Sequence, residues 1–497
     1  MTSPRTVVLH GLQRRASLNG QQARLEGYQA HHKRFKVRLL QSGIGVEALP
    51  CNMRWPDGKP ITIPVSVVAS VGGGGQQKML QSQWCIQPGE VIVEELPSVV
   101  VGQTDGDFAL SDALAAFFQL TREQQAILLS LQANSKIATV DGTTSTDAIV
   151  RQLMLDSGVI PHGEEATASK FLGVFDANSF QFQHSPGKFL GGVFPLLSRV
   201  NHSCSPTAVR YDVGGGLRLV ALVPIPPGSE ITISYLPSER LFAPRAVRHE
   251  RLSSWFPTCW CARCAESVET VRRFPCDSST MGCRGDCTAA VASAAAHGGT
   301  GPLKDALDVA DPLGASIASP LQPCRLCGST PTAESAAAAL RWESQLHRTL
   351  AEWSAVLPGE GFPATTAQVV ATLGLARKAL APAHWLRAAL CALAAPPLVA
   401  AGERTAAVEC LGDWCDGWAA AFGTACLPAA WRREGQGDLI AQASPRSRAT
   451  LAAAAAAYRR AQSELKRLAM PMGLNHTAGI QEKLREVERA SEDDSGG

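Results

Sequence analysis

Groups able to do chemistry gather between residues 196 and 264. Cys259, Cys261 and Cys264 place three thiols within six residues. Such spacing is typical of structural Zn²⁺ sites, where four thiolates bind at about 2.3 Å. The segment 196–206 is an apolar run that breaks into Asn-His-Ser-Cys-Ser-Pro, which predicts a strand ending in a polar turn. The segment 228–235 predicts a second strand, which follows a Pro-Pro-Gly turn and closes with a tyrosine.

The order of these segments resembles the SET-domain protein lysine methyltransferases, most closely the SMYD-like branch with a cysteine-rich post-SET segment. That family carries Arg-x-x-Asn-His-Ser-Cys-x-Pro-Asn, then Gly-Glu-Glu-Ile-Thr-Ile-x-Tyr, then Cys-x-Cys-x-x-Cys. This chain differs by one residue in the spacing of Arg199, by Thr207 in place of Asn and by Ser229 in place of Glu. SMYD proteins also carry a MYND zinc finger. Because no cysteine lies between Cys85 and Cys204, we expect that finger to be absent.

The resemblance implies methyl transfer from S-adenosyl-L-methionine to a lysine amine of a histone or another protein. In SET enzymes the tyrosine that closes the Ile-Thr-Ile-x-Tyr strand is catalytic, which is Tyr235 here. The same resemblance assigns donor binding to Asn201, His202, Ser198, Val200, Asn178, Phe256, Gly73 and Gly75. The two glycines would let backbone approach the donor, although they lie about four residues earlier than in the family. Asn178 would belong to a strand that touches the donor, and Glu230 would be structural.

The resemblance also completes the thiol cluster, because the family takes its fourth zinc ligand from Asn-His-Ser-Cys, here Cys204. The zinc would fasten the post-SET segment and bring Phe256 over the donor. A second zinc site is expected downstream, where either Cys283 or Cys287 could complete the set. The set that we adopt is Cys276, Cys287, Cys324 and Cys327.

The helices and strands that the sequence predicts around these groups indicate an α+β protein. We expect a SET-domain β fold with a pseudoknot and a helical insert, a small N-terminal β module and an all-α C-terminal domain. The expected divisions are a basic β module at 1–56, a SET domain at 64–236 with an insert at about 108–175, a post-SET zinc segment at 237–270, a cysteine-bearing linker at 271–332 and a helical domain at 333–490. After residue 333, further helices are expected at 365–380, 383–395, 403–421 and 447–469, and a capping box at Thr121 predicts a helix start within the insert.

Composition narrows the function classes. The chain has 497 residues, 45% of them hydrophobic, and a net charge of +2, which excludes a polyanion-binding chain as a whole. Positive charge gathers at the N-terminus, either as a solvated face or as a patch for an acidic partner such as nucleic acid. The basic residues there are Arg5, Arg14, Arg15, Arg24, Lys33, Arg34, Lys36 and Arg38.

No membrane partner is expected, because the longest uncharged apolar run, 388–402, is shorter than the roughly 20 residues that span a bilayer. Fifteen cysteines in this spacing favour reduced thiols and metal binding. We therefore expect an intracellular protein, in the nucleus, the cytoplasm or both.

Two other functions fit the sequence. The chain could be a SET-like zinc-stabilised scaffold that binds protein partners without activity, because the glycines are displaced and Thr207 replaces Asn. Alternatively, the C-terminal helices and the basic N-terminus could be the working parts, with the SET segment as a structural core. Donor binding separates the first alternative from the enzyme. Partner binding after deletion of 333–497 tests the second.

Overall fold

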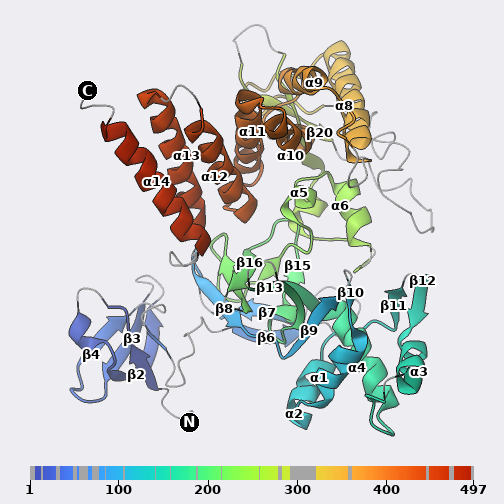
Figure 1. The fold of residues 1–497 in the computed structure, drawn as a ribbon, viewed down its shortest axis with the longest axis vertical. Helices are drawn as coiled ribbons and strands as arrows, with labels where there is room; N and C mark the ends of the chain where they lie inside the picture. Colours follow the sequence, from blue (N-terminus) through green and yellow to red (C-terminus); the bar gives the residue numbers. More distant parts are fainter. Residues whose placement is uncertain are drawn as a thin grey trace. The chain divides into compact units, whose positions relative to one another are not determined.

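The computed structural model describes residues 6–12, 15–29, 34–48, 53–54, 65–69, 78–83, 85–104, 107–139, 142–156, 158–185, 188–213, 215–253, 255–256, 258–277, 283–290, 321–355, 361–443, 447–468 and 475–493. The fold is α+β (Figure 1). The chain divides into two compact units. The first holds residues 1–202 and 206–233, and the second holds 203–205 and 234–497.

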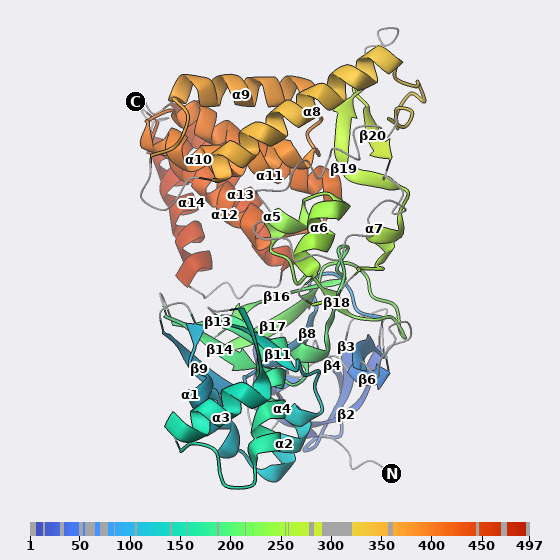
Figure 2. The same cartoon turned by 90° about the vertical axis from the view of Figure 1, so that its right-hand side faces the viewer.

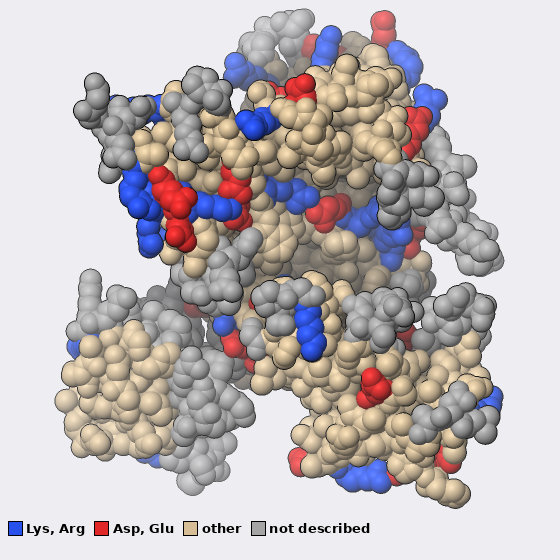
Figure 3. Space-filling view, in the orientation of Figure 1, with Lys and Arg blue, Asp and Glu red and all other residues tan. Residues whose placement is uncertain are grey.

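The N-terminal module is a five-stranded antiparallel sheet in the order β4-β3-β2-β1-β5. Its strands are β1 (Thr6–Leu9), β2 (Gln22–Gln29), β3 (Arg34–Leu39), β4 (Gly45–Ala48) and β5 (Met53–Arg54). Buried Val37 and Leu39 alternate along β3 with exposed Lys36 and Arg38, as a half-buried strand requires. Lys36 lies opposite Glu47 of β4, so acidic and basic residues mix on this face. In Figure 3 the visible face of the module is largely uncharged.

Outside the insert, the described residues between 65 and 233 form short sheets. Strand β17 (Gly216–Ala221) pairs with β16 (Ala208–Val213) on one side and β8 (Val91–Glu95) on the other. A four-stranded sheet runs β10 (Asp107–Phe108), β9 (Val99–Thr104), β14 (Lys188–Val193), β13 (Ser179–Ser185). Strand β6 (Val65–Ala69) pairs with β7 (Lys78–Ser82), and β15 (Asn201–His202) pairs in parallel with β18 (Thr232–Ile233).

The insert is mainly helical. It holds α1 (Leu110–Phe118), α2 (Arg122–Leu129), α3 (Thr146–Asp156) and α4 (Glu165–Asn178), which share a core of stacked Phe117 and Phe171. The predicted capping box at Thr121 is confirmed, because its side chain accepts from Gln124 and the Gln124 side chain bonds back. The insert also contains a hairpin that the sequence analysis missed, β11 (Lys136–Thr139) with β12 (Gly142–Ser145).

In the second unit, residues 237–270, which the sequence analysis assigned to a post-SET segment, carry α5 (Ser238–Leu241), α6 (Arg245–Leu252) and α7 (Ala262–Ala265). The chain continues into an antiparallel hairpin of β19 (Val268–Pro275) and β20 (Asp286–Ala290). Figure 2 shows this hairpin beside α8, to which Arg272 of β19 is joined by an ion pair.

The helical region consists of α8 (Ala333–Ser354), α9 (Thr366–Ala379), α10 (Trp385–Ala400), α11 (Arg404–Phe422), α12 (Leu427–Ala441), α13 (Arg448–Arg467) and α14 (Asn475–Asp493). Each helix contacts the next one along the chain. Helices α12 and α14 were not predicted, and α10 continues through Pro396 and Pro397, past the predicted end at residue 395. Figure 3 shows acidic and basic side chains close together over α13 and α14, where Arg459 pairs with Glu488.

Phe242, just after α5, fixes the post-SET segment to the helical region. Its ring packs edge-on against Trp414, Trp418 and Phe422 of α11. Aromatic pairs of this geometry each add about 0.5–1.5 kcal/mol beyond the area that they bury. Within the described ranges, no helix combines the length and hydropathy needed to cross a membrane.

Candidate functional site

Asn201 and His202 form the short strand β15, which lies parallel to β18. The Asn201 amide nitrogen donates to the Glu230 carboxylate at 2.7 Å. This bond gives Glu230 the structural position that the resemblance implied, and it fixes the orientation of the Asn201 amide.

The turn ahead of β15 is held from a distance in sequence by Glu95 at the end of β8. The Glu95 carboxylate accepts the backbone N–H groups of Leu196 and Leu197, both at 2.9 Å. Burial raises the pKa of Glu95, and these two hydrogen bonds oppose that effect. Ser198 in the turn donates to the Asn178 carbonyl at 3.3 Å, and Val200 is buried. Sequence reasoning did not single out Glu95 as the support of this turn.

Asn178 was expected to lie in a strand, and this was wrong. It is the last residue of α4, and strand β13 begins at the next residue, Ser179. Its amide nitrogen donates to the carbonyls of Val174 at 2.8 Å and Gln132 at 2.6 Å. A buried amide satisfies its donors, and here both bonds go to backbone. Gly73 and Gly75, the other expected donor-binding residues of this unit, lie outside the described residues.

Thr207, which replaces the usual Asn, makes a reciprocal pair with Thr232 of β18. The Thr232 N–H donates to the Thr207 hydroxyl at 2.9 Å, and the Thr207 N–H donates to the Thr232 hydroxyl at 3.2 Å. The departure from the family pattern therefore has a structural explanation, because both backbone donors are satisfied.

Tyr235 lies two residues after β18 and is half-buried against two aromatic side chains of the post-SET segment. Its ring centroid is 5.9 Å from that of Trp255 and 6.4 Å from that of Phe256. Phe256, which was expected to lie over the donor, thus packs beside Tyr235, and Trp255 is a neighbour that the sequence analysis missed. Trp255 is 52% exposed, so its ring meets both Tyr235 and solvent.

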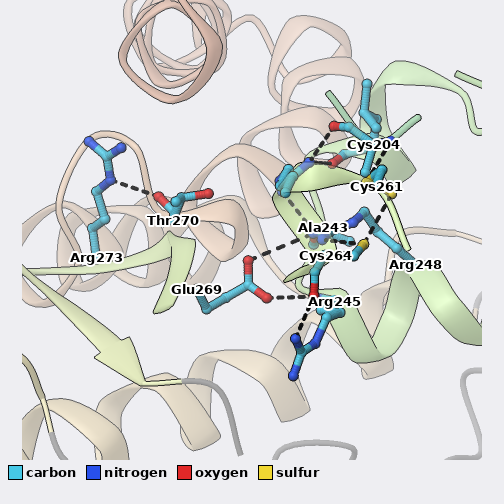
Figure 4. Close-up of polar contacts among 11 residues, drawn as sticks. Cys204, Ala243, Arg245, Arg248, Cys261, Cys264, Glu269, Thr270 and Arg273 are labelled. Carbon is cyan, nitrogen blue, oxygen red and sulfur yellow. Dashed lines mark hydrogen bonds and ion pairs between the residues drawn. The ribbon is translucent and has the colours of Figure 1, made fainter. Parts of the chain in front are cut away.

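Four thiols come together as expected in the first cysteine cluster. The sulfur atoms of Cys204, Cys259, Cys261 and Cys264 all lie within 4.8 Å of one another. Cys264 Sγ lies 3.6 Å from Cys204 Sγ, and the Cys204 N–H donates to Cys261 Sγ at 3.3 Å (Figure 4). A tetrahedron with Zn–S bonds of about 2.3 Å has S–S edges of about 3.8 Å, so the spacing fits a bound zinc ion.

Two buried arginines surround this cluster. Arg248 donates to Cys264 Sγ at 3.5 Å and lies 3.7 Å from Glu269, and Arg263 donates to the Cys204 carbonyl at 3.2 Å. Burial lowers the pKa of Arg263 to about 10. Buried cations need compensating negative charge. A zinc ion with four thiolates carries two negative charges, which suits two buried guanidinium groups. The sequence offered no signal for this role beyond the presence of arginines near the motif.

A second group of four thiols contains Cys276, Cys283, Cys324 and Cys327. The adopted set is therefore wrong at one position, because Cys283 takes the place assigned to Cys287. Cys287 lies in β20 opposite Phe274, its side chain is fully buried, and burial raises the pKa of its thiol to about 11. The position of each thiol explains the difference, because Cys287 lies in β20 and is buried in the core, while Cys283 lies on the loop before β20.

Comparison with known proteins places the SET signal in the first unit and just beyond. Residues 80–236 match the family model of the SET domain. Over 158 residues the chain is 28% identical to the SET domain-containing protein SmydA-8, isoform A, of Drosophila melanogaster, covering 31% of this chain and 32% of that protein. Over 98 residues it is 26% identical to a SET domain-containing protein of Dictyostelium discoideum, covering 18% of this chain and 24% of that one. The chain thus spans a third or less of these curated relatives, and the matches support a SET-domain protein with similarity to a SMYD-type relative.

Proposed function

We propose that this chain is an S-adenosylmethionine-dependent protein lysine N-methyltransferase whose post-SET segment is held by a structural zinc ion. The observation that carries the proposal is the packing of Tyr235 against Trp255 and Phe256. The strand-end tyrosine that the SET resemblance makes catalytic packs against two aromatic rings from the segment that also carries three thiols of the first cluster.

When bound, the donor supplies a methyl group on a sulfonium, which is already a good leaving group. The chain must therefore orient the lysine amine and keep it neutral. Free lysine has a pKa of about 10.4, and an apolar surrounding lowers it by disfavouring the charged form. In this proposal the Trp255 and Phe256 rings supply apolar surface beside Tyr235, and the Tyr235 hydroxyl orients the reacting groups.

Among the residues that the resemblance assigns, the donor is held directly by Asn201, His202, Ser198, Val200, Phe256, Gly73 and Gly75. The bond to Glu230 uses the Asn201 amide nitrogen and leaves its carbonyl oxygen as an acceptor for the donor's ammonium group. Because both bonds of the Asn178 amide go to backbone, its contribution is to hold the turn through its carbonyl and Ser198. The substrate is a lysine of a histone or another protein.

Zinc on Cys204, Cys259, Cys261 and Cys264 has a mechanical role in this proposal. The ligands come from the turn after β15 and from the start of α7, so the ion joins segments 55 or more residues apart in sequence. Trp255 and Phe256 lie a few residues before Cys259, and their position near Tyr235 depends on that connection.

The test is transfer of tritiated methyl groups to mixed histones and cell lysate, beside calorimetric titration with the donor. Tyr235→Phe is expected to bind the donor like wild type and to lose transfer by about 10²-fold or more, as expected when a positioned catalytic group is removed. Tyr458→Phe is the matched control, since it removes a hydroxyl that bonds Asp438 in the helical region. Equal transfer by wild type and Tyr235→Phe would refute the catalytic role. Failure of wild type to bind the donor would favour the zinc-stabilised scaffold.

A further inference from the structure

The second group of thiols has the geometry of a metal centre. Cys276 Sγ lies 3.7 Å from Cys327 Sγ, and Cys283 Sγ lies 3.8 Å from Cys324 Sγ. All four sulfur atoms lie within 4.8 Å of one another. These distances match the edges of a tetrahedron of thiolates around zinc, about 3.8 Å, and they far exceed a disulfide bond of about 2.05 Å.

The backbone around these thiols is arranged to support thiolates. The Gly285 N–H donates to Cys283 Sγ at 3.3 Å, and the Leu326 N–H donates to Cys324 Sγ at 3.4 Å. Such bonds favour the charged form of sulfur, which is the form that binds metal. Each of the two loops thus presents a thiol together with a donor two residues later.

Gly285 shows that the loops close tightly around the sulfur atoms. A Cβ atom at this position would lie 2.6 Å from Cys324 Sγ and 3.2 Å from Cys283 Sγ. No side chain fits there while both thiols keep their positions. The absence of a side chain is therefore a requirement of the cluster itself.

We propose that Cys276, Cys283, Cys324 and Cys327 bind a second structural zinc ion that fastens the segment leading into α8 onto the β19–β20 hairpin. Four sulfur ligands in a tetrahedron select zinc or a single iron among common metals, and a closed set of four is typical of structural zinc. The centre is separate from the one beside Tyr235 and does not depend on the proposed methyl transfer.

The position of the centre shows which segments a bound metal ion would connect. Residues 321–325 run beside β20, with the Gln322 N–H donating to the Thr288 carbonyl and the Arg325 N–H to the Asp286 carbonyl. The hairpin in turn meets the helical region, where the Ala381 N–H donates to the Arg273 carbonyl at 3.1 Å. The metal therefore completes a continuous connection from the hairpin to the start of α8.

The experiment counts zinc in the purified full-length chain by native mass spectrometry and elemental analysis. Wild type is expected to hold two zinc ions, one for each thiol group. Cys283→Ala is expected to hold one. The matched control is Cys287→Ala, which removes a thiol four residues away and is expected to keep both.

A second variant guards against loss of folding. Cys327 is exposed, so Cys327→Ala disturbs little packing and is also expected to hold one zinc ion. Gly285→Ala is expected to lose the same ion through displacement of Cys324, and circular dichroism checks that the helices persist.

Each of three outcomes would overturn the proposal. Wild type could hold no more zinc than Cys283→Ala, the ion could survive in both Cys283→Ala and Cys327→Ala, or the denatured mass could show two disulfides among these thiols. Iron in place of zinc would overturn the assignment of the metal.

Discussion

The ion pair between Arg272 and Glu343 offers the sharpest test of how the hairpin and the helical region hold together. Arg272 Nε and Nη2 donate to the two Glu343 oxygens at 2.8 and 2.6 Å. The side chains are only 3% and 2% exposed. His384 Nε2 lies 3.3 Å from Glu343 Oε1, and His384 Nδ1 accepts a hydrogen bond from the Leu386 N–H at 3.2 Å.

Removal of one partner leaves a buried charge without its counter-ion, which costs about 3–5 kcal/mol. Arg272→Met is therefore expected to lower the free energy of unfolding by that amount. The double variant Arg272→Met/Glu343→Gln removes both charges and keeps an acceptor for His384, so it should recover about 1–3 kcal/mol of the loss. Arg459→Met is the control, because Arg459 and Glu488 form an exposed pair, which contributes about 1 kcal/mol or less.

The assay is urea unfolding of the full chain, followed by tryptophan fluorescence and by circular dichroism at neutral pH. The helical region carries Trp353, Trp414 and Trp418 in its core, so its unfolding gives a strong signal. The reasoning is refuted if Arg272→Met costs no more than Arg459→Met. It is also refuted if the loss of unfolding free energy in the double variant equals the sum of the losses in Arg272→Met and Glu343→Gln.

The same pair predicts how stability depends on pH. Its environment lowers the pKa of Glu343 to about 2, because the Arg272 and His384 hydrogen bonds outweigh the opposing effect of burial. The folded state therefore gains about 3 kcal/mol from this carboxylate above pH 4.5, and loses that gain as the pH falls towards 2. Burial lowers the pKa of His384, so stability begins to fall as the pH drops below 6.5. Unfolding measured from pH 7.5 to 3 should show both losses, and Glu343→Gln should remove the lower one.

Two further predictions concern the packing around Tyr458 and the hydrogen bonds of Thr207. Gly437→Ala would place a Cβ atom 2.6 Å from the Tyr458 ring and should cost about 1–3 kcal/mol, while Gly435→Ala on the same helix meets its neighbour at 3.7 Å and should gain about 0.5–1 kcal/mol. Thermal midpoints that move in the same direction would contradict this pair. Thr207→Val removes the acceptor of the buried Thr232 N–H and should cost about 1–3 kcal/mol, whereas Thr207→Ser keeps the hydroxyl and most of the stability. Equal midpoints for the two Thr207 variants would show that the hydroxyl pair contributes little.

Local patterns predicted what depends on neighbours in sequence. The Cys-x-Cys-x-x-Cys spacing, the turn before Tyr235 and the capping box at Thr121 are all short-range signals, and the structure has a thiol cluster, a strand and a helix start there. The choice between Cys283 and Cys287 could not be made this way, because it depends on which of them faces the core of the hairpin once β19 and β20 pair.

Other features depend on contacts between distant residues. Glu95 reaches the turn at Leu196 across about a hundred positions, and Arg272 meets Glu343 across 71. No periodicity or motif marks such partners. The helix expected at 383–395 extends to residue 400 through Pro396 and Pro397, because the buried face of α10, with Leu390, Ala394 and Leu398, offsets the cost of the missing N–H groups.

The assignment of Ser203–Ser205 to the second unit has a consequence for synthesis on the ribosome. Cys204 leaves the ribosome 60 residues before Cys264, so the group of four thiols proposed to bind zinc stays incomplete until residue 264 has been synthesised. The segment 203–205 is therefore synthesised well before the rest of the unit to which it belongs. A fragment that starts at residue 234 carries three of the four thiols, and one that stops at 236 carries one. If the zinc proposal is right, neither fragment should retain the ion of this thiol group.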